Sequence, residues 1–139
     1  MTIRHQAREA ALQVLYFCQV SQAPAAEAIE AVFTEHLPDA PDSVKTFATR
    51  LVHGAASESG ALDALIEQQA QNWRLERLAV LDRLILRMAI WELQHELETP
   101  APVVINEALE LARTFSSDDS VRFVNGVLDG IRKTLGREA

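Results

Sequence analysis

Apolar residues recur every three or four positions along most of the chain, and this spacing limits the possible folds more than any other feature. It is the period of an α-helix that is buried on one side. The sequence contains no alternating strand pattern bounded by hairpin turns, no internal repeat and no low-complexity linker. We therefore expect an all-α fold, a compact bundle of about seven helices.

The N-terminal half carries the signals for three helices. The period covers residues 3–20, and Pro24 can stand in the first turn of a second helix because its missing N–H is not needed there. Asp42 or Ser43 can cap a third helix. Its apolar stripe continues past Gly60 with the same period, so we expect one long and bent helix.

The C-terminal half is expected to contain the core helix. From Glu76 to Leu97, apolar residues surround the helix almost completely, which predicts a central element. The stretch 99–102 ends it and opens the next helix, and Ser116 or Ser117 can cap the last one. The inward stripes of the two final helices are expected at Val104, Ala108, Leu111, Ala112 and Phe115, then at Val121, Val124, Leu128, Ile131 and Leu135.

Gly126 lies inside the last predicted helix, where glycine costs about 1 kcal/mol relative to alanine. A close helix crossing or the approach of a ligand would explain it. Close packing is the simpler of the two reasons.

Length and composition narrow the class of protein. With 139 residues, 48% of them hydrophobic, the chain fits one domain, residues 1–139. No apolar run approaches the roughly 18 to 20 residues of a membrane span, and the start lacks an apolar secretory signal, so we expect a cytoplasmic protein. Cys18 is the only cysteine, which excludes an internal disulfide and a zinc site of paired cysteines and favours a buried thiol.

The net charge of -7 argues against a nucleic-acid partner, but its distribution matters more than its sum. Residues 21–70 hold eight acidic and two basic side chains, whereas residues 1–20 carry Arg4 and Arg8 against Glu9. We therefore expect any nucleic-acid face to avoid the 21–70 segment.

Catalysis finds little support in the sequence. Glu92 and His95, three apart on one helix, resemble half of a di-iron site, but no second half is present. The single cysteine lacks a base, and none of the five glycines forms a phosphate-binding motif. We expect a protein that is not an enzyme and that has no metal and no cofactor.

Two groups of residues are candidates for binding RNA. Arg4, His5 and Arg8 share one helix surface and could meet successive phosphates, although a solvated first turn is the alternative. Arg122 and Phe123 stand near the N-terminus of the last helix, where a cation, an aromatic face and backbone N–H groups can meet RNA. The pattern alone favours burial of Phe123.

Asp82 and Arg83 lie on the predicted central helix. They could be an exposed charged edge or part of a protein-binding surface, and the pattern alone favours the exposed edge.

Three blocks in order resemble the NusB family: residues 8–16 (REAALQVLY), 81–89 (LDRLILRMA) and 103–129, with a looser match over 21–70. The resemblance implies two packed helical subdomains, roughly 1–72 and 73–139. It also implies an RNA-binding factor of transcription antitermination without catalysis. Such a factor pairs with ribosomal protein NusE, binds boxA RNA and helps the RNA polymerase elongation complex, with other Nus factors, to transcribe ribosomal RNA operons.

The same resemblance assigns roles to individual residues. The RNA-contacting positions of the family fall on Arg4, His5, Arg8, Asp119, Arg122 and Phe123. The NusE-facing positions fall on Tyr16 and Asp82. This overturns the preference for burying Phe123.

The chain departs from the family pattern at two places. His5 and Gln6 replace a fuller run of arginines, so RNA binding by the isolated protein should be weaker and less steep in salt. Ser116 stands where glycine is more usual; serine can cap a helix but is less free to adopt positive φ.

Two alternatives stay open. One is a protein–protein adaptor with the same fold but little RNA affinity of its own. The net charge favours this alternative, as does the replacement of arginines by His5 and Gln6. The other is a detached relative of the helical domain that precedes some RNA methyltransferases, inactive by itself because a glycine-rich cofactor-binding sequence is absent.

Overall fold

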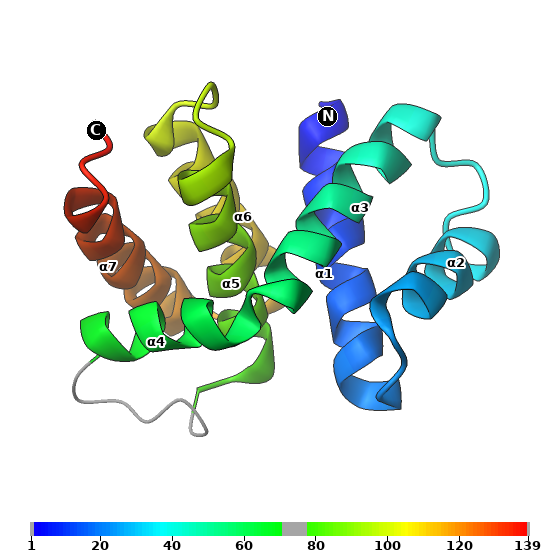
Figure 1. Ribbon diagram of the computed structural model, residues 1–139, viewed down its shortest axis with the longest axis horizontal. Coiled ribbons are helices and arrows are strands. Elements are labelled where there is room, and N and C mark those ends of the chain that lie inside the picture. Colours follow the sequence, from blue (N-terminus) through cyan, green and yellow to red (C-terminus); the bar gives the residue numbers. More distant parts are fainter. Residues whose placement is uncertain (1, 71–77, 139) are drawn as a thin grey trace. The chain divides into compact units, whose positions relative to one another are not determined.

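The computed structural model describes residues 2–70 and 78–138, and these form seven α-helices and no strand (Figure 1). The all-α prediction is therefore confirmed. In chain order the helices are α1 (Ile3–Ser21), α2 (Ala25–Glu35), α3 (Asp42–Ser57), α4 (Ser59–Gln69), α5 (Val80–His95), α6 (Ala101–Phe115) and α7 (Asp118–Thr134). None of the described helices is long and apolar enough to cross a membrane.

The helices divide into two compact units, one that ends at Ser57 and one that begins at Glu58. In the first unit α1 packs on α3 and on α2. Small side chains on α1, such as Ala7 and Ala11, are fully buried and allow this close approach. Phe47 and Leu51 of α3 are buried in the same unit. The predicted stripe of the first helix is thus buried from Ala7 to Leu15, whereas Ile3 at its start is 41% exposed.

In the second unit α5 and α7 each contact the other three helices, and α5 is the helix whose buried face is widest. Its buried residues lie on several sides, as the sequence predicts: Leu84, Ile85, Leu86, Met88, Ala89, Ile90 and Leu93. The predicted start of this helix at Glu76 lies outside the described residues, and the helix begins at Val80.

The single long helix expected from residue 42 onward is wrong, since α3 and α4 are separate helices. Glu58 stands between them with φ -107° and ψ 17°, outside the helical range. Its carboxylate accepts a hydrogen bond from the indole Nε1 of Trp91 at 3.0 Å, which ties this break to α5. The two units divide here, whereas the resemblance placed the division near residue 72, outside the described residues.

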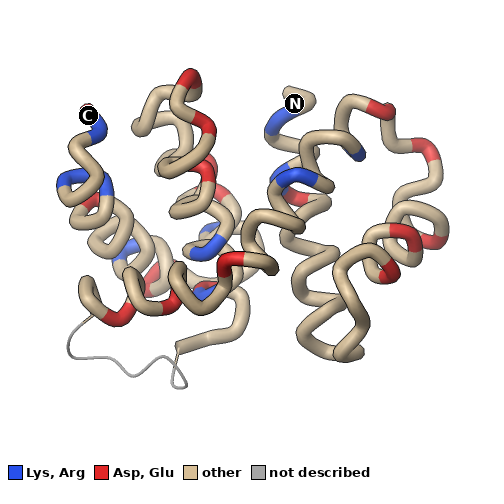
Figure 2. Tube along the Cα trace, viewed as in Figure 1, with Lys and Arg blue, Asp and Glu red and all other residues tan. Residues whose placement is uncertain are grey.

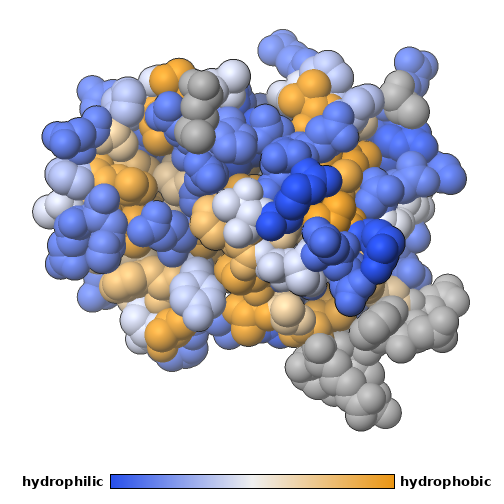
Figure 3. Space-filling view, turned by 180° about the vertical axis from the view of Figure 1, so that it is seen from behind, coloured by the Kyte–Doolittle hydropathy of each residue, from blue (hydrophilic) through white to orange (hydrophobic). Residues whose placement is uncertain are grey.

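Several details of packing differ from the predicted stripes. Phe115, the last residue of α6, and Leu135, which follows α7, remain 45% and 37% exposed, and Cys18 is only half-buried. A Cβ added to Gly126 would meet nothing within 4 Å, so the close crossing expected there is wrong. The tight position is Gly130, where a Cβ would lie 2.0 Å from Oε1 of Gln69. Figure 3 shows hydrophobic residues among hydrophilic ones on one face of the surface.

Candidate nucleic-acid interface

The beginning of α1 presents the first predicted binding group. Thr2 caps the helix, with its Oγ1 accepting a hydrogen bond from the His5 N–H at 3.0 Å. The Nε2 atom of His5 lies 3.7 Å from the carboxylate of Glu9, one turn further along the helix. Arg4 is exposed, but Arg8 is only 3% exposed. The sequence predicted that the three residues share one exposed helix surface. They do not, because Arg8 is covered.

Two arginines at the start of α1, Arg4 and Arg8, lie near the aromatic ring of Phe47. The guanidinium carbon of Arg4 lies 3.7 Å from the ring centroid and that of Arg8 lies 5.6 Å from it. Both distances are within the range of cation–π attraction. Phe47 comes from α3, so α3 holds the arginines of α1 in place.

The beginning of α7 presents the second group. Ser117 caps this helix and accepts a hydrogen bond from the Ser120 N–H at 3.2 Å, as predicted for Ser116 or Ser117. Asp118 and Asp119 occupy the first turn, where the helix dipole favours negative charge. Arg122 donates a hydrogen bond to the Asp119 carboxylate.

These two paired side chains remain open to solvent. The side chain of Arg122 is 78% exposed and that of Asp119 is 89% exposed. Phe123, the next residue, is half-buried and has further interactions within the chain. The full burial favoured by the pattern alone is therefore wrong.

Asp82 is buried, at 6% exposure, and the exposed charged edge expected there is wrong. Its carboxylate accepts hydrogen bonds from the hydroxyl of Ser116 at 2.9 Å and from that of Ser120 at 2.7 Å. The two hydroxyls lie 2.8 Å from each other. Asp82 thus joins the start of α5 to the junction of α6 and α7. Ser116 has φ -128°, so it needs no positive φ.

Tyr16 lies on an apolar groove of the first unit, with a volume of about 240 Å³. Its side chain is 46% exposed, and Val20 one turn later is 66% exposed. The groove is lined by Gln13, Tyr16, Phe17, Val20, Ser21, Val32 and His36. Burial raises the pKa of the nearby Cys18 thiol, which favours its uncharged form.

Glu92 and His95 have different surroundings in the structure. Glu92 is 2% exposed, whereas the Nε2 atom of His95 lies 3.2 Å from the Glu58 carboxylate and its ring packs on Trp91. Among the described residues, no group of three or more histidine, cysteine or acidic side chains could hold a metal ion.

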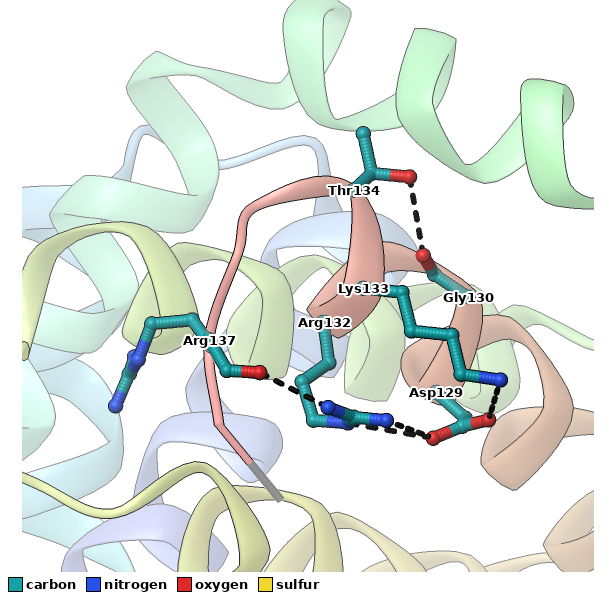
Figure 4. Close-up of polar contacts among 6 residues, drawn as sticks. All are labelled: Asp129, Gly130, Arg132, Lys133, Thr134 and Arg137. Atoms are coloured by element: carbon teal, nitrogen blue, oxygen red, sulfur yellow. Dashed lines mark hydrogen bonds and ion pairs between the residues drawn. The ribbon is translucent and has the colours of Figure 1, made fainter.

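The C-terminal end of α7 is held by polar contacts (Figure 4). Asp129 accepts hydrogen bonds from Arg132 at 2.9 Å and lies 3.2 Å from the Lys133 ammonium. Hydrogen bonds from Arg132 and then Lys133 lower the pKa of the Asp129 carboxyl. Arg132 also donates to the backbone oxygen of Arg137, whose guanidinium reaches the Leu93 carbonyl at 2.7 Å. These contacts fix the helix that carries Arg122.

Each predicted binding group is local to one unit: Arg4, His5, Arg8 and Tyr16 belong to the first and Asp82, Asp119, Arg122 and Phe123 to the second. Two residues that hold the predicted site residues in place, Phe47 and Ser120, were not predicted from the sequence. Ser120 precedes Val124 by one turn and so continues the buried stripe of α7, which is a signal that could have revealed it.

Comparison with known proteins gives a consistent result. The model of the NusB family matches residues 5–133. The transcription antitermination protein NusB of Koribacter versatilis is 44% identical over 135 residues, which cover 97% of this chain and 92% of that protein. The protein of the same name from Myxococcus xanthus is 41% identical and covers 99% of both chains.

Solved structures agree with these relatives. NusB of T. maritima matches with a TM-score of 0.87 and 32% identity over 96% of this chain and 92% of that chain. A structure of the antitermination factors NusB and NusE in complex with dsRNA matches with a TM-score of 0.84 and 27% identity, over 96% of this chain and 98% of that chain. With the family model spanning both units and relatives above 40% identity along nearly the whole length, the chain belongs to the NusB family.

Proposed function

We propose that this protein is a transcription antitermination factor that binds boxA RNA together with ribosomal protein NusE and supports transcription of ribosomal RNA operons. The observation that carries the proposal is the exposed pair of Asp119 and Arg122 beside the half-buried Phe123 at the capped start of α7. It combines a cation with a half-buried aromatic side chain, and cations and aromatic faces are the groups that commonly bind the phosphates and unpaired bases of RNA. The similar structure that contains NusB, NusE and dsRNA supports it.

The partner surface in this proposal includes Tyr16 and its groove. A half-exposed tyrosine beside an apolar groove offers a protein partner contact area with a polar tip, a combination common in interfaces. Asp82 is the second proposed position for NusE. The Asp82 carboxylate already accepts hydrogen bonds from two serine hydroxyls. It would therefore contribute to NusE binding mainly by fixing the junction of α6 and α7.

In this role the protein acts by binding alone, without catalysis, in the cytoplasm, as part of an elongation complex with RNA polymerase and other Nus factors. NusE would add basic surface to a site that this chain fills only in part.

A fluorescence anisotropy titration tests the proposal. Labelled boxA RNA and a scrambled RNA are titrated with the protein, with and without NusE, at fixed salt. We expect tighter binding of boxA with NusE than without it, and a loss of about tenfold for Arg122→Ala. Equal affinity for both RNAs under every condition would refute it.

The adaptor with little RNA affinity of its own remains the second candidate. Two observations favour it: Arg8 is covered, and Arg122 is paired with Asp119. A pull-down that recovers NusE, together with RNA binding at background even when NusE is present, would select this alternative.

A further inference from the structure

Three arginines surround the ring of Phe47 in the first unit. In addition to Arg4 and Arg8 of α1, the guanidinium carbon of Arg50 on α3 lies 5.8 Å from the same ring centroid. All three distances are within the range of cation–π attraction. One aromatic ring therefore gathers positive charge from two helices.

The three arginines differ in exposure. Phe47 and Arg8 are buried, at 4% and 3% exposure, and form the base of the cluster. Arg4 and Arg50 are exposed. A guanidinium that lies over a ring keeps its N–H donors at its edge, where phosphate oxygens can accept two of them at once. The outer two arginines are therefore the ones suited to meet a phosphate.

The surrounding charges support this reading of the surface. All lysines and arginines described in the first unit lie on α1 and α3, as Figure 2 shows. Its acidic residues lie on α2 and between α2 and α3, apart from Glu9 on α1 and Asp42 at the start of α3. The acidic sum of the 21–70 segment thus conceals a basic surface on one of its helices. Charge summed along a sequence does not report which residues share a surface.

We propose that Arg50 is a further phosphate-contacting residue of the RNA surface and that Phe47 is a positioning residue that holds Arg4 and Arg50 together. This rests on the proposed function and adds residues to the same site. It contradicts the expectation that a nucleic-acid face avoids residues 21–70. Arg50 supplies a cation beside a helix start in which His5 and Gln6 provide no fixed charge.

Removal of Arg50 is the first test, using the full chain with NusE and boxA RNA over a range of salt concentrations. Arg50→Ala should weaken binding about five- to tenfold and reduce the slope of log K against log salt by about 0.7, the value for one lost phosphate contact on a single strand. Arg50→Lys should keep the slope, because the charge remains.

Lys45→Ala is the matched control on the same helix. The Lys45 ammonium lies 3.2 Å from a Glu30 carboxylate oxygen and near Phe33, away from the Phe47 cluster. The Lys45→Ala substitution removes one positive charge from α3, as Arg50→Ala does, but it should change the slope of log K against log salt little. An equal loss for Lys45→Ala and Arg50→Ala would show that only net charge matters and would overturn the proposal.

Phe47→Leu tests the positioning role, because it keeps an apolar side chain and removes the aromatic face. We expect it to weaken RNA binding in the wild-type background but to add little in an Arg4→Ala, Arg50→Ala background. A purely structural effect would add equally in both, and a thermal melt records stability separately. If Phe47→Leu fails to fold, Arg50→Ala still decides the main claim.

The outcomes separate this inference from the proposed function. Loss of binding with Arg122→Ala but none with Arg50→Ala refutes the inference and leaves the proposed function in place. If the wild-type protein binds boxA no better than scrambled RNA with NusE present, both fail.

Discussion

The starts of α1 and α7 carry the same kind of predicted RNA contact in opposite surroundings. Arg8 of α1 is 3% exposed and lies near the Phe47 ring, whereas the Arg122 side chain of α7 is 78% exposed and pairs with a residue one turn away. A covered arginine contributes its aliphatic stem and its charge to packing. An exposed i, i+3 pair contributes little to folding.

This difference separates stability from binding. Substitutions in the α1 group should affect both, because Arg8 is part of the core of the first unit. Substitutions of exposed residues at the start of α7 should affect binding alone. Unfolding measurements on matched substitutions test that separation.

Arg8→Ala should lower the free energy of unfolding by about 3 kcal/mol. The substitution removes the buried guanidinium that lies near the Phe47 ring and leaves unfilled space in its place. Arg122→Ala should change it by less than about 0.5 kcal/mol. Urea unfolding of both variants measures the two values. Equal losses of stability for the two variants would contradict the idea that Arg8 supports the fold whereas Arg122 does not.

Asp82→Ala should cost about 2 kcal/mol, because the hydroxyls of Ser116 and Ser120 lose their acceptor in a buried place. Asp119→Ala at the exposed start of α7 should cost less than about 1 kcal/mol. The same unfolding titration provides both numbers. An Asp82→Ala variant as stable as Asp119→Ala would contradict the buried network.

Gly126→Ala should stabilise the protein by up to about 1 kcal/mol, since a Cβ at this position meets nothing within 4 Å and alanine favours the helix. The measurement is the shift of the thermal midpoint. Weaker binding of boxA RNA by this more stable variant would show that the open glycine lets the ligand approach α7. Unchanged binding would leave the glycine without such a role.

The smallest effect concerns pH. Arg132 and Lys133 lower the pKa of Asp129 in the folded chain, so this carboxylate stabilises the fold above its ordinary value of 3.8 and loses that contribution as the pH falls through the lowered value. Asp129→Asn should therefore be less stable than wild type at neutral pH, and the difference should shrink below pH 3.8. Thermal melts of both proteins at each pH check this. A constant difference would contradict it.

The helices could be predicted from the sequence because their apolar periods are long and regular. The break at Glu58 could not, since the period of α3 continues into α4 across it, and only the contact with Trp91 reveals why the chain turns there. Phe115 and Leu135 follow the period of their helices but lie at the ends, where the neighbouring helix no longer covers them.

The site residues were predicted through the family resemblance more than through local pattern. Whether an arginine is covered depends on the helix that packs over it, and the distant residue Phe47 decides this for Arg8. For Asp82 a local signal exists, because it precedes the buried residues Ile85 and Leu86 by three and four positions. A charged residue on a buried stripe predicts a polar partner inside the fold.

The pairing of Arg122 with Asp119 has a consequence for how the protein selects its ligand. A phosphate that reaches Arg122 has to compete with a carboxylate that is already bound, so the exchange replaces one anion by another with a small net gain. Polyanions that offer charge alone should therefore be retained poorly at α7. Discrimination at this helix then depends on groups that a carboxylate cannot imitate, such as a base that stacks on Phe123.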